Sequence, residues 1–287
     1  MTAPLLFDRK LLLARRERAL RLGAERFLLE PVAEELVERL SAVKRNFALA
    51  LDLGTPGDTL IRLLKSNSQV AGVAANDLLA NDEEAFSLPD AKYDLVVSAL
   101  ALQWVNDLPG ALVQIRRTLK PDGLLLAALV GGETLHELRE SFATAEAEIT
   151  GGASPRVSPF AEVRSLGSLL QRAGYALPVI DSDRHTVRYE TPFKLFQDLR
   201  RMGATNALME RSRKPLTKKI IARAAEIYTE RFRDPDGRLR ATFDILWVAG
   251  WVPHESQQKP LKPGSAKMRL ADALGSTEKT TGEKPDR

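Results

Sequence analysis

Three apolar runs lie within residues 48–132, and they constrain the fold of this 287-residue chain more than any other feature. The runs cover residues 48–54, 93–102 and 124–130. Each is rich in residues that suit a β-strand buried on both faces. Between the second and third runs, apolar residues recur at helical spacing from Leu108 to Leu119, and Pro121 and Gly123 end that helix. Strand, covering helix and strand make a βαβ crossover, so the sequence predicts an α/β protein with a Rossmann-like, doubly wound, mostly parallel sheet.

The first run ends in a turn that leads into a helix. Asp52 and Gly54 stand at this turn. In a doubly wound fold, a nucleotide-like ligand binds at such a place because glycines allow close approach of the backbone and the helix start presents free N–H groups. Asp52 and Gly54 are therefore candidates to hold a cofactor. A capping aspartate followed by a plain turn glycine fits the spacing equally well.

The stretch between the first and second runs is short. Residues 69–75 suit a strand, and Asp77 follows it with a carboxylate suited to ribose hydroxyls. Too few residues then remain before the strand at 93, because a complete βαβ crossover needs about 30 residues. We expect one strand or its covering helix to be missing here. Asp77 and Asp82 are candidate ligands for ribose and adenine, although plain loop acids are the simpler interpretation.

The flanking segments predict helices around this sheet. Residues 1–45 have an amphipathic helical pattern, broken at Glu30 and Pro31, and predict an amino-terminal helical cap over the open end of the sheet. Residues 46–258 form the main domain, with a helical insertion at about 191–234 before a last strand at 241–251. Two short strands are expected within 176–190. Residues 259–287 are polar and have the composition of a disordered tail.

Composition excludes several kinds of site. The chain has no cysteine, which rules out disulfides, thiolate nucleophiles and cysteine-bound metals. Its three histidines are far apart, so we expect no metal site. No apolar run approaches the roughly 20 residues of a membrane-spanning helix. The net charge of +4 is small, and we expect no nucleic-acid partner. Basic clusters at 9–26 and 211–219 fit solvated helix faces, while contact with an acidic protein or a membrane surface stays open.

Several motifs resemble those of the class I S-adenosylmethionine-dependent methyltransferases. Leu-Asp-Leu-Gly at 51–54 is similar to the start of their cofactor loop, and residues 94–98, 102–109 and 119–123 are similar to their fourth strand, its helix and the approach to the fifth strand. Within that superfamily, the chain most resembles the respiratory complex I assembly factors that act as arginine hydroxylases, and more distantly the malonyl-carrier-protein methyltransferases of the biotin pathway. Further motifs that carry this resemblance are Phe-Asp-Arg at 7–9, Arg-Asn-Phe at 45–47, Gly-Gly-Glu-Thr-Leu at 131–135, Arg-Ala-Gly-Tyr at 172–175 and Gly-Trp at 250–251.

The resemblance implies a function and a site. It implies S-adenosylmethionine as cofactor and a protein client, a respiratory complex I subunit, with the protein in the bacterial cytoplasm or the mitochondrial matrix. The cofactor-binding residues that it implies are Asp52, Gly54, Gly57, Asp77, Asp82 and Gln103. It assigns no catalytic residue and no metal ligand.

The chain departs from this family in the cofactor loop. Where the family has two further glycines, this chain has Pro56 and Asp58. Pro56 removes a backbone donor, and Asp58 places a negative charge near the expected carboxylate of the cofactor's methionine part. If the altered loop limits binding, replacing both residues by glycine should raise cofactor affinity. A second hypothesis is therefore a catalytically inactive scaffold or assembly chaperone that keeps the fold but has a degraded cofactor site.

Overall fold

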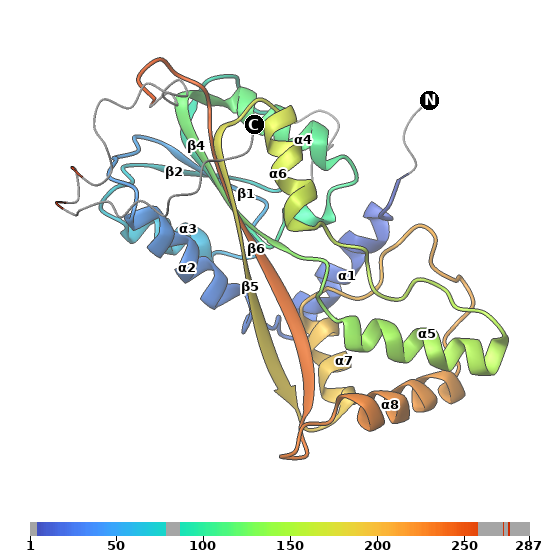
Figure 1. Ribbon diagram of the computed structural model, residues 1–287. Coiled ribbons are helices and arrows are strands. Elements are labelled where there is room, and N and C mark those ends of the chain that lie inside the picture. The colour runs from blue at the N-terminus through green and yellow to red at the C-terminus, as the bar shows by residue number, and fades with distance from the viewer. Residues whose placement is uncertain (1–4, 79–86, 258–271, 273–274, 276–287) are drawn as a thin grey trace, which may run out of the picture. The chain divides into compact units, whose positions relative to one another are not determined.

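The computed structural model describes residues 5–78, 87–257, 272 and 275, and a six-stranded sheet runs through this part of the chain (Figure 1). The strand order is β2-β1-β3-β4-β6-β5. The strands are β1 Ala50–Leu53, β2 Val73–Asn76, β3 Tyr93–Ala99, β4 Leu119–Val130, β5 Ala176–Tyr189 and β6 Leu239–Trp251. β1 pairs in parallel with β2 and β3, β3 pairs in parallel with β4, and β6 runs antiparallel to β4 and β5. The predicted parallel pairing of the three apolar runs is confirmed, and so is the mostly parallel α/β fold.

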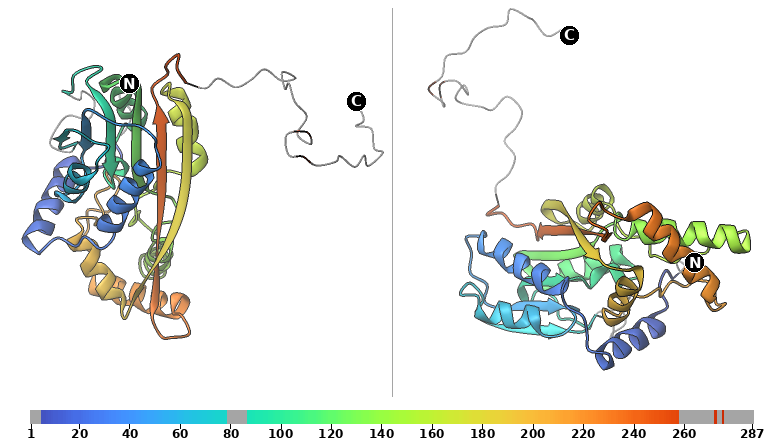
Figure 2. Two further views of the ribbon diagram at one scale, coloured as in Figure 1. Left: turned by 90° about the vertical axis from the view of Figure 1, so that its left-hand side faces the viewer. Right: turned by 90° about the horizontal axis from the view of Figure 1, so that it is seen from below.

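Helices cover both faces of the sheet (Figure 2). They are α1 Arg9–Arg21, α2 Leu29–Ser41, α3 Thr59–Ser66, α4 Leu108–Thr118, α5 His136–Thr150, α6 Val163–Arg172, α7 Pro192–Arg201 and α8 Lys218–Phe232, with a short 3₁₀ helix η1 at Leu102–Trp104. Leu95, Val97 and Leu126 belong to the apolar core with α2 and α3. Val96 and Leu125 belong to the core with α4 and α6. Because alternate side chains of a strand enter opposite layers, the central parts of β3 and β4, residues 95–97 and 124–130, are apolar on both faces.

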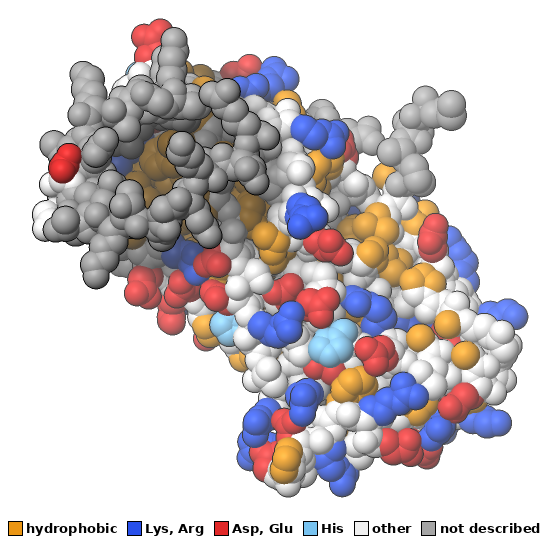
Figure 3. All heavy atoms as spheres, in the orientation of Figure 1, with side chains coloured by type: hydrophobic (Ala, Val, Ile, Leu, Met, Phe, Trp, Pro, Cys, Tyr) orange, Lys and Arg blue, Asp and Glu red, His pale blue; other side chains and the backbone are white. Residues whose placement is uncertain are grey.

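The far ends of β5 and β6 carry an arm of three helices, α5, α7 and α8 (Figure 1). Phe142 of α5 and Tyr228 of α8 are buried in the same core as Phe243 and Ile245 of β6. Side chains of both charges intermingle over the visible face of this arm (Figure 3). The ion pair between Arg223 Nε and Glu148 Oε2, at 2.7 Å, joins α8 to α5. The helices of the arm are therefore held to one another by this ion pair and to β6 by the shared core.

Pro31 does not break the amino-terminal helical region as predicted. α2 begins at Leu29, so Pro31 lies in its first turn, and the chain between α1 and α2 occupies residues 22–28. The N–H groups of a first helical turn have no partner within the helix, so the donor that proline lacks is not missed. The predicted break at Glu30 and Pro31 was therefore misplaced, because the break precedes α2 and Pro31 belongs to the first turn of that helix.

The two short strands predicted within 176–190 are one continuous strand, β5. Its residues pair with β6 in unbroken register from Val179 to Tyr189. The polar run that suggested an interruption, residues 181–186, lies at the edge of the sheet, where most of its side chains are exposed. Polar residues are tolerated there because neither face is fully covered.

The region between β2 and β3 contains no strand among its described residues, 77–78 and 87–92. Residues 79–86, which include Asp82, lie outside the described part of the chain, as does nearly all of the tail predicted at 259–287. In the ranges that the structure does describe, no helix is long and apolar enough to cross a membrane. Those ranges also hold no group of three or more histidine, aspartate or glutamate side chains placed to bind a metal ion.

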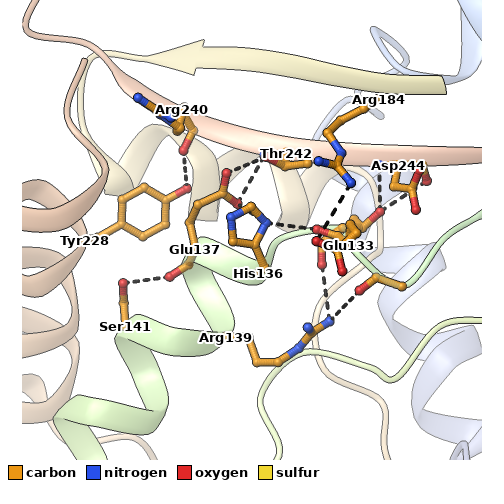
Figure 4. A network of polar contacts seen from close by, with 12 residues as sticks. Glu133, His136, Glu137, Arg139, Ser141, Arg184, Tyr228, Arg240, Thr242 and Asp244 are labelled. Carbon is orange, nitrogen blue, oxygen red and sulfur yellow. Dashed lines mark hydrogen bonds and ion pairs between the residues drawn. The ribbon is translucent and has the colours of Figure 1, made fainter. Parts of the chain in front are cut away.

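Glu137 at the start of α5 is fully buried and ties the arm to β6 (Figure 4). Its carboxylate accepts hydrogen bonds from the backbone N–H of Thr242, at 3.2 Å, and from the Thr242 hydroxyl, at 2.5 Å. Beside it, the hydroxyl of Tyr228 donates to the carbonyl oxygen of Arg240 at 2.7 Å. These bonds satisfy polar groups that are cut off from water, and they fix α5 and α8 against one strand.

We expect Glu137→Ala to lower the free energy of unfolding by about 2–4 kcal/mol, because it leaves the two buried donors of Thr242 without an acceptor. Urea denaturation followed by circular dichroism measures the change. Glu140→Ala is the matched control, since Glu140 is an exposed glutamate of the same helix, and it should change stability by less than about 0.5 kcal/mol. Equal effects of the two substitutions would contradict the assigned role of Glu137.

Candidate functional site

A cavity of about 930 Å³ lies where β1, β2 and β3 end. Its floor comes from residues that directly follow these strands, and α1 together with residues 203–206 and 211–212 lines other parts of its wall. The carboxyl ends of parallel strands, at the point where strand order reverses, are where doubly wound sheets bind ligands. The volume is at the upper end of the range of about 300–1,000 Å³ that is usual for small-molecule sites. It leaves room for a cofactor and part of a second molecule.

Asp52 is the most informative residue of the cavity. Its side chain is only 2% exposed, and its Oδ1 atom is buried with no hydrogen-bond partner. Burial raises the pKa of Asp52 to about 6, although hydrogen bonds from the hydroxyl and the backbone of Thr55 act in the opposite direction. A buried carboxylate oxygen without a donor is costly unless a ligand supplies one. Asp52 is therefore suited to an ammonium or hydroxyl group of a bound molecule.

Gly54 shapes the turn that follows Asp52. It has a φ of +76°, and its N–H donates to the carbonyl oxygen of Asn76 at 2.8 Å. A Cβ atom at this position would lie 2.6 Å from Cβ of Leu78 and 3.2 Å from Cβ of Ala101. The turn thus packs against the ends of two neighbouring strands, and only glycine fits there.

Asp58 faces solvent at the start of α3. Its side chain is 62% exposed, and it forms ion pairs with Arg26 at 3.4 Å and with Arg62 at 3.3 Å. The guanidinium of Arg26 also lies beside Gly57. A Cβ atom added at Gly57 would be 3.4 Å from Nη2 of Arg26. The negative charge expected to disturb the cofactor loop is therefore offset by two arginines.

The other predicted residues lie around the same cavity. Gly57, Asp77 and Gln103 all line it, together with Asp52 and Gly54, whereas Asp82 lies outside the described residues. Nε2 of Gln103 donates to the carbonyl oxygen of Leu100 at 2.8 Å, and its Oε1 is buried without a partner. The fold thus brings the described candidates together, and their role in binding stays a prediction.

Aromatic residues also line the cavity. Trp104 is buried, and its ring packs edge-on against Phe7 at 5.4 Å and against Phe160 at 6.5 Å between centroids. Both Trp104 and Phe160 form part of the cavity wall. The Trp104 side chain therefore both packs against other rings and borders the cavity.

Arg15 and Arg16 of α1 were missed as site residues. The sequence suggested that they lie on a solvated helix face, but both line the cavity. Burial lowers the pKa of each to about 10. The helix buries Leu12 and Ala19, and Arg15 and Arg16 fall on the same side of it. The helical spacing of these four residues could therefore have indicated that the two arginines face the rest of the protein.

Comparison with known proteins gives the family. A family model described as "Methyltransferase domain" matches residues 24–178, which is more than half of the chain. The chain belongs to this methyltransferase family. The predicted resemblance to class I methyltransferases is thereby confirmed.

Relatives of this methyltransferase-family protein match along most of their own length. The protein named arginine-hydroxylase NDUFAF5, mitochondrial, of Danio rerio is 39% identical over 86% of this chain and 81% of the relative. Its Homo sapiens counterpart is also 39% identical, over 86% and 76%. A malonyl-[acyl-carrier protein] O-methyltransferase of Halorhodospira halophila is 32% identical over 86% and 90%.

A solved structure supports the fold of this methyltransferase-family protein. A putative methyltransferase from Bacillus halodurans superposes with a TM-score of 0.51 and 16% identity, over 77% of this chain and 99% of that one. At this level of identity the likeness concerns the fold alone.

Proposed function

We propose that this chain binds S-adenosylmethionine at the end of β1 and modifies an arginine side chain of a protein client during assembly of respiratory complex I. The observation that carries the proposal is the buried, unpartnered Oδ1 of Asp52 in the cavity wall. An ionised Asp52 is complementary to the ammonium group of the cofactor's methionine part. When bound, that cofactor supplies an activated methyl sulfonium.

Residues of this chain would orient the two molecules rather than attack either of them. Asp77, which follows β2 and lines the cavity, would accept hydrogen bonds from ribose hydroxyls. Beyond the strand ends, one part of the cavity wall is apolar, with Leu138, Phe142 and Phe196 of the arm helices. An apolar wall excludes water from the reacting groups, and rate enhancement then comes from orientation.

The relatives support the choice of client. Proteins 39% identical to this chain over most of their length are named arginine-hydroxylases of mitochondria. We therefore propose arginine as the acceptor, with the activity in the mitochondrial matrix of a eukaryote or the cytoplasm of a bacterium. The substrate is then a protein side chain rather than a free metabolite.

Mass spectrometry of the client tests this proposal. The purified protein is incubated with S-adenosylmethionine and complex I subunits captured from its own host, and arginine-containing peptides are compared before and after. We expect one arginine either to exchange a hydrogen atom for the methyl group of the cofactor, a net gain of one CH2 unit, or, when dioxygen and a two-electron reductant are supplied, to gain one oxygen atom. The Asp52→Asn variant should produce neither gain. Stable binding of a subunit without any change in mass would favour the inactive scaffold and contradict the proposal.

We also expect Arg26, rather than Asp58, to control how well the altered loop binds the cofactor. Asp58→Asn should change the affinity for S-adenosylmethionine by less than about 3-fold, because two arginines already offset its charge. Arg26→Ala should weaken binding by about 10-fold, because it uncovers that charge beside Gly57. The double variant should bind about as well as Asp58→Asn alone.

Calorimetric titration of the four proteins checks this charge relation. A strong gain in affinity for Asp58→Asn, with no effect of Arg26→Ala, would show that Asp58 acts directly on the ligand and that Arg26 does not offset it.

A further inference from the structure

Two arginines of the cavity wall, one from α1 and one from the segment before α8, lie close to a third arginine of α1. Arg15 and Arg211 line the cavity, and Arg18 lies beside Arg15 on the same helix. We call Arg15, Arg18 and Arg211 the arginine cluster. Nη2 of Arg18 donates to the hydroxyl of Thr205 at 3.2 Å, and Nη1 of Arg211 donates to the carbonyl oxygen of Leu208 at 2.6 Å. These bonds hold two of the three side chains in place.

The cluster has more positive charge than its neighbours neutralise. Asp8 is the one carboxylate that acts on Arg15, and it already forms an ion pair with Arg211 at 3.0 Å. Asp8 also caps α1 by accepting a hydrogen bond from the N–H of Leu11. Asp8 is therefore shared between Arg15 and Arg211, and the charges that act on Arg18 are those of Arg21 and Arg200.

Buried donors of the cluster have no acceptor. Nη1 of Arg15 and Nε of Arg18 are both buried without a hydrogen-bond partner. Burial, and the neighbouring charges of Arg18 and Arg211, lower the pKa of Arg15 to about 10, so it stays charged at neutral pH. Gathering like charges away from water is unfavourable unless an anion compensates them. Guanidinium groups bind carboxylates through paired, charge-assisted hydrogen bonds.

Arg15 and Arg16 both line the cavity, but different charges act on them. The charge of Asp77, at the end of β2, acts on Arg16, whereas the charges that act on Arg15 come from Arg18, Arg211 and Asp8. Successive residues of a helix point in directions that differ by about 100°. Arg16 is thus the arginine near Asp77, on the proposed ribose side, and Arg15 is the one near Arg211.

We propose that the arginine cluster is a subsite for an acidic side chain of the client, close in sequence to the arginine that is modified. This inference rests on the proposed function, since it takes the second occupant of the cavity to be a peptide segment. On this inference, the protein recognises its client by an acidic residue near the modified arginine, and not by the arginine alone.

Two synthetic peptides of equal length test the subsite. Each has one central arginine, flanked by aspartates in the first peptide and by asparagines in the second. With S-adenosylhomocysteine present, we expect the wild-type protein to bind the aspartate peptide about 10-fold tighter or more, as measured by fluorescence anisotropy. Arg15→Gln should reduce this preference to less than about 3-fold. Lys10→Gln, a change at an exposed basic residue of the same helix, should leave it unchanged.

The outcomes separate this inference from the proposed function. Failure of the wild-type protein to bind S-adenosylmethionine or S-adenosylhomocysteine would overturn the proposed function. Normal cofactor binding with equal affinity for the two peptides, or with no binding of either, would overturn the acidic subsite alone. Even if Arg15→Gln does not fold, the affinities of the wild-type protein for the two peptides still show whether it prefers an acidic neighbour.

A carboxylate of the cofactor is the other source of an anion for this cluster. Methylthioadenosine lacks the amino-acid part of S-adenosylhomocysteine and so provides the control ligand. If Arg15→Gln weakens binding of S-adenosylhomocysteine but not of methylthioadenosine, the cluster holds the cofactor and the client subsite is wrong. We expect both ligands to bind Arg15→Gln as they bind the wild-type protein.

Discussion

Asp52→Asn should weaken binding of S-adenosylmethionine by at least about 30-fold and, at the same time, stabilise the ligand-free protein at neutral pH. Asparagine has the same shape as aspartate but no charge, so the ammonium group of the cofactor loses its counter-ion. The ligand-free protein no longer has to bury an ionised carboxylate whose Oδ1 has no partner. Loss of binding with a gain in stability is the signature of a residue that serves a ligand rather than the fold.

The size of the stabilisation follows from the pKa of Asp52. Burial raises this pKa from an ordinary 3.8 to about 6, so the native state holds its proton more tightly than the unfolded state does. An acid of this kind destabilises the protein increasingly as the pH rises from about 4 to about 6, and the full effect, at most about 3 kcal/mol, is present at neutral pH. We expect Asp52→Asn to raise the free energy of unfolding by about 1–3 kcal/mol at neutral pH and by little near pH 4.

Urea denaturation at both pH values, and calorimetric titration of the cofactor, measure these two effects. In the wild-type protein, affinity for S-adenosylmethionine should also fall as the pH falls through about 6, because the ammonium group prefers the ionised form of Asp52. A destabilised Asp52→Asn variant that still binds the cofactor would contradict the assigned role.

Gly54→Ala should destabilise the protein by about 2–5 kcal/mol. The new methyl group would need a φ of +76° and would stand 2.6 Å from Cβ of Leu78, which cannot move away without shifting the backbone. The turn after β1 would then separate from the end of β2, and cofactor affinity should fall with it.

Gly57→Ala is the matched control for Gly54→Ala. Gly57 has the same φ of +76°, but a methyl group added there would meet only the flexible side chain of Arg26, at 3.4 Å or more. Gly57→Ala should therefore lower the free energy of unfolding only by the backbone strain, about 1–2 kcal/mol. Thermal or urea denaturation of the two variants gives the comparison. If both lose the same stability, the contact with Leu78 does not constrain the turn.

The sheet could be predicted from the sequence where burial is complete on both faces. The segments of β1, β3 and β4 are mostly apolar on both faces, since helices cover both of their sides. β5 could not be predicted as a whole, because residues 181–186 are polar and their strand conformation depends on pairing with β6. The start of α2 was misplaced because a proline is compatible with the end of one helix and with the first turn of the next.

The residues of the candidate site could also be predicted only in part. Asp52, Gly54 and Gly57 follow directly from the turn after β1, and the structure places them, with Asp77 and Gln103, around one cavity. Arg15 was assigned to solvent because a sequence shows that a helix is amphipathic but not which element packs against it. The ion pairs of Asp58 with Arg26 and Arg62 were also missed, since Arg26 comes from a different part of the chain.

The central claim is that the altered loop, with Pro56 and Asp58, still forms a working site for S-adenosylmethionine. Isothermal titration of the purified protein with this cofactor at neutral pH tests it most directly. We predict one site with a dissociation constant of about 1–100 μM. The absence of heat with millimolar ligand, confirmed by an unchanged melting temperature, would contradict it.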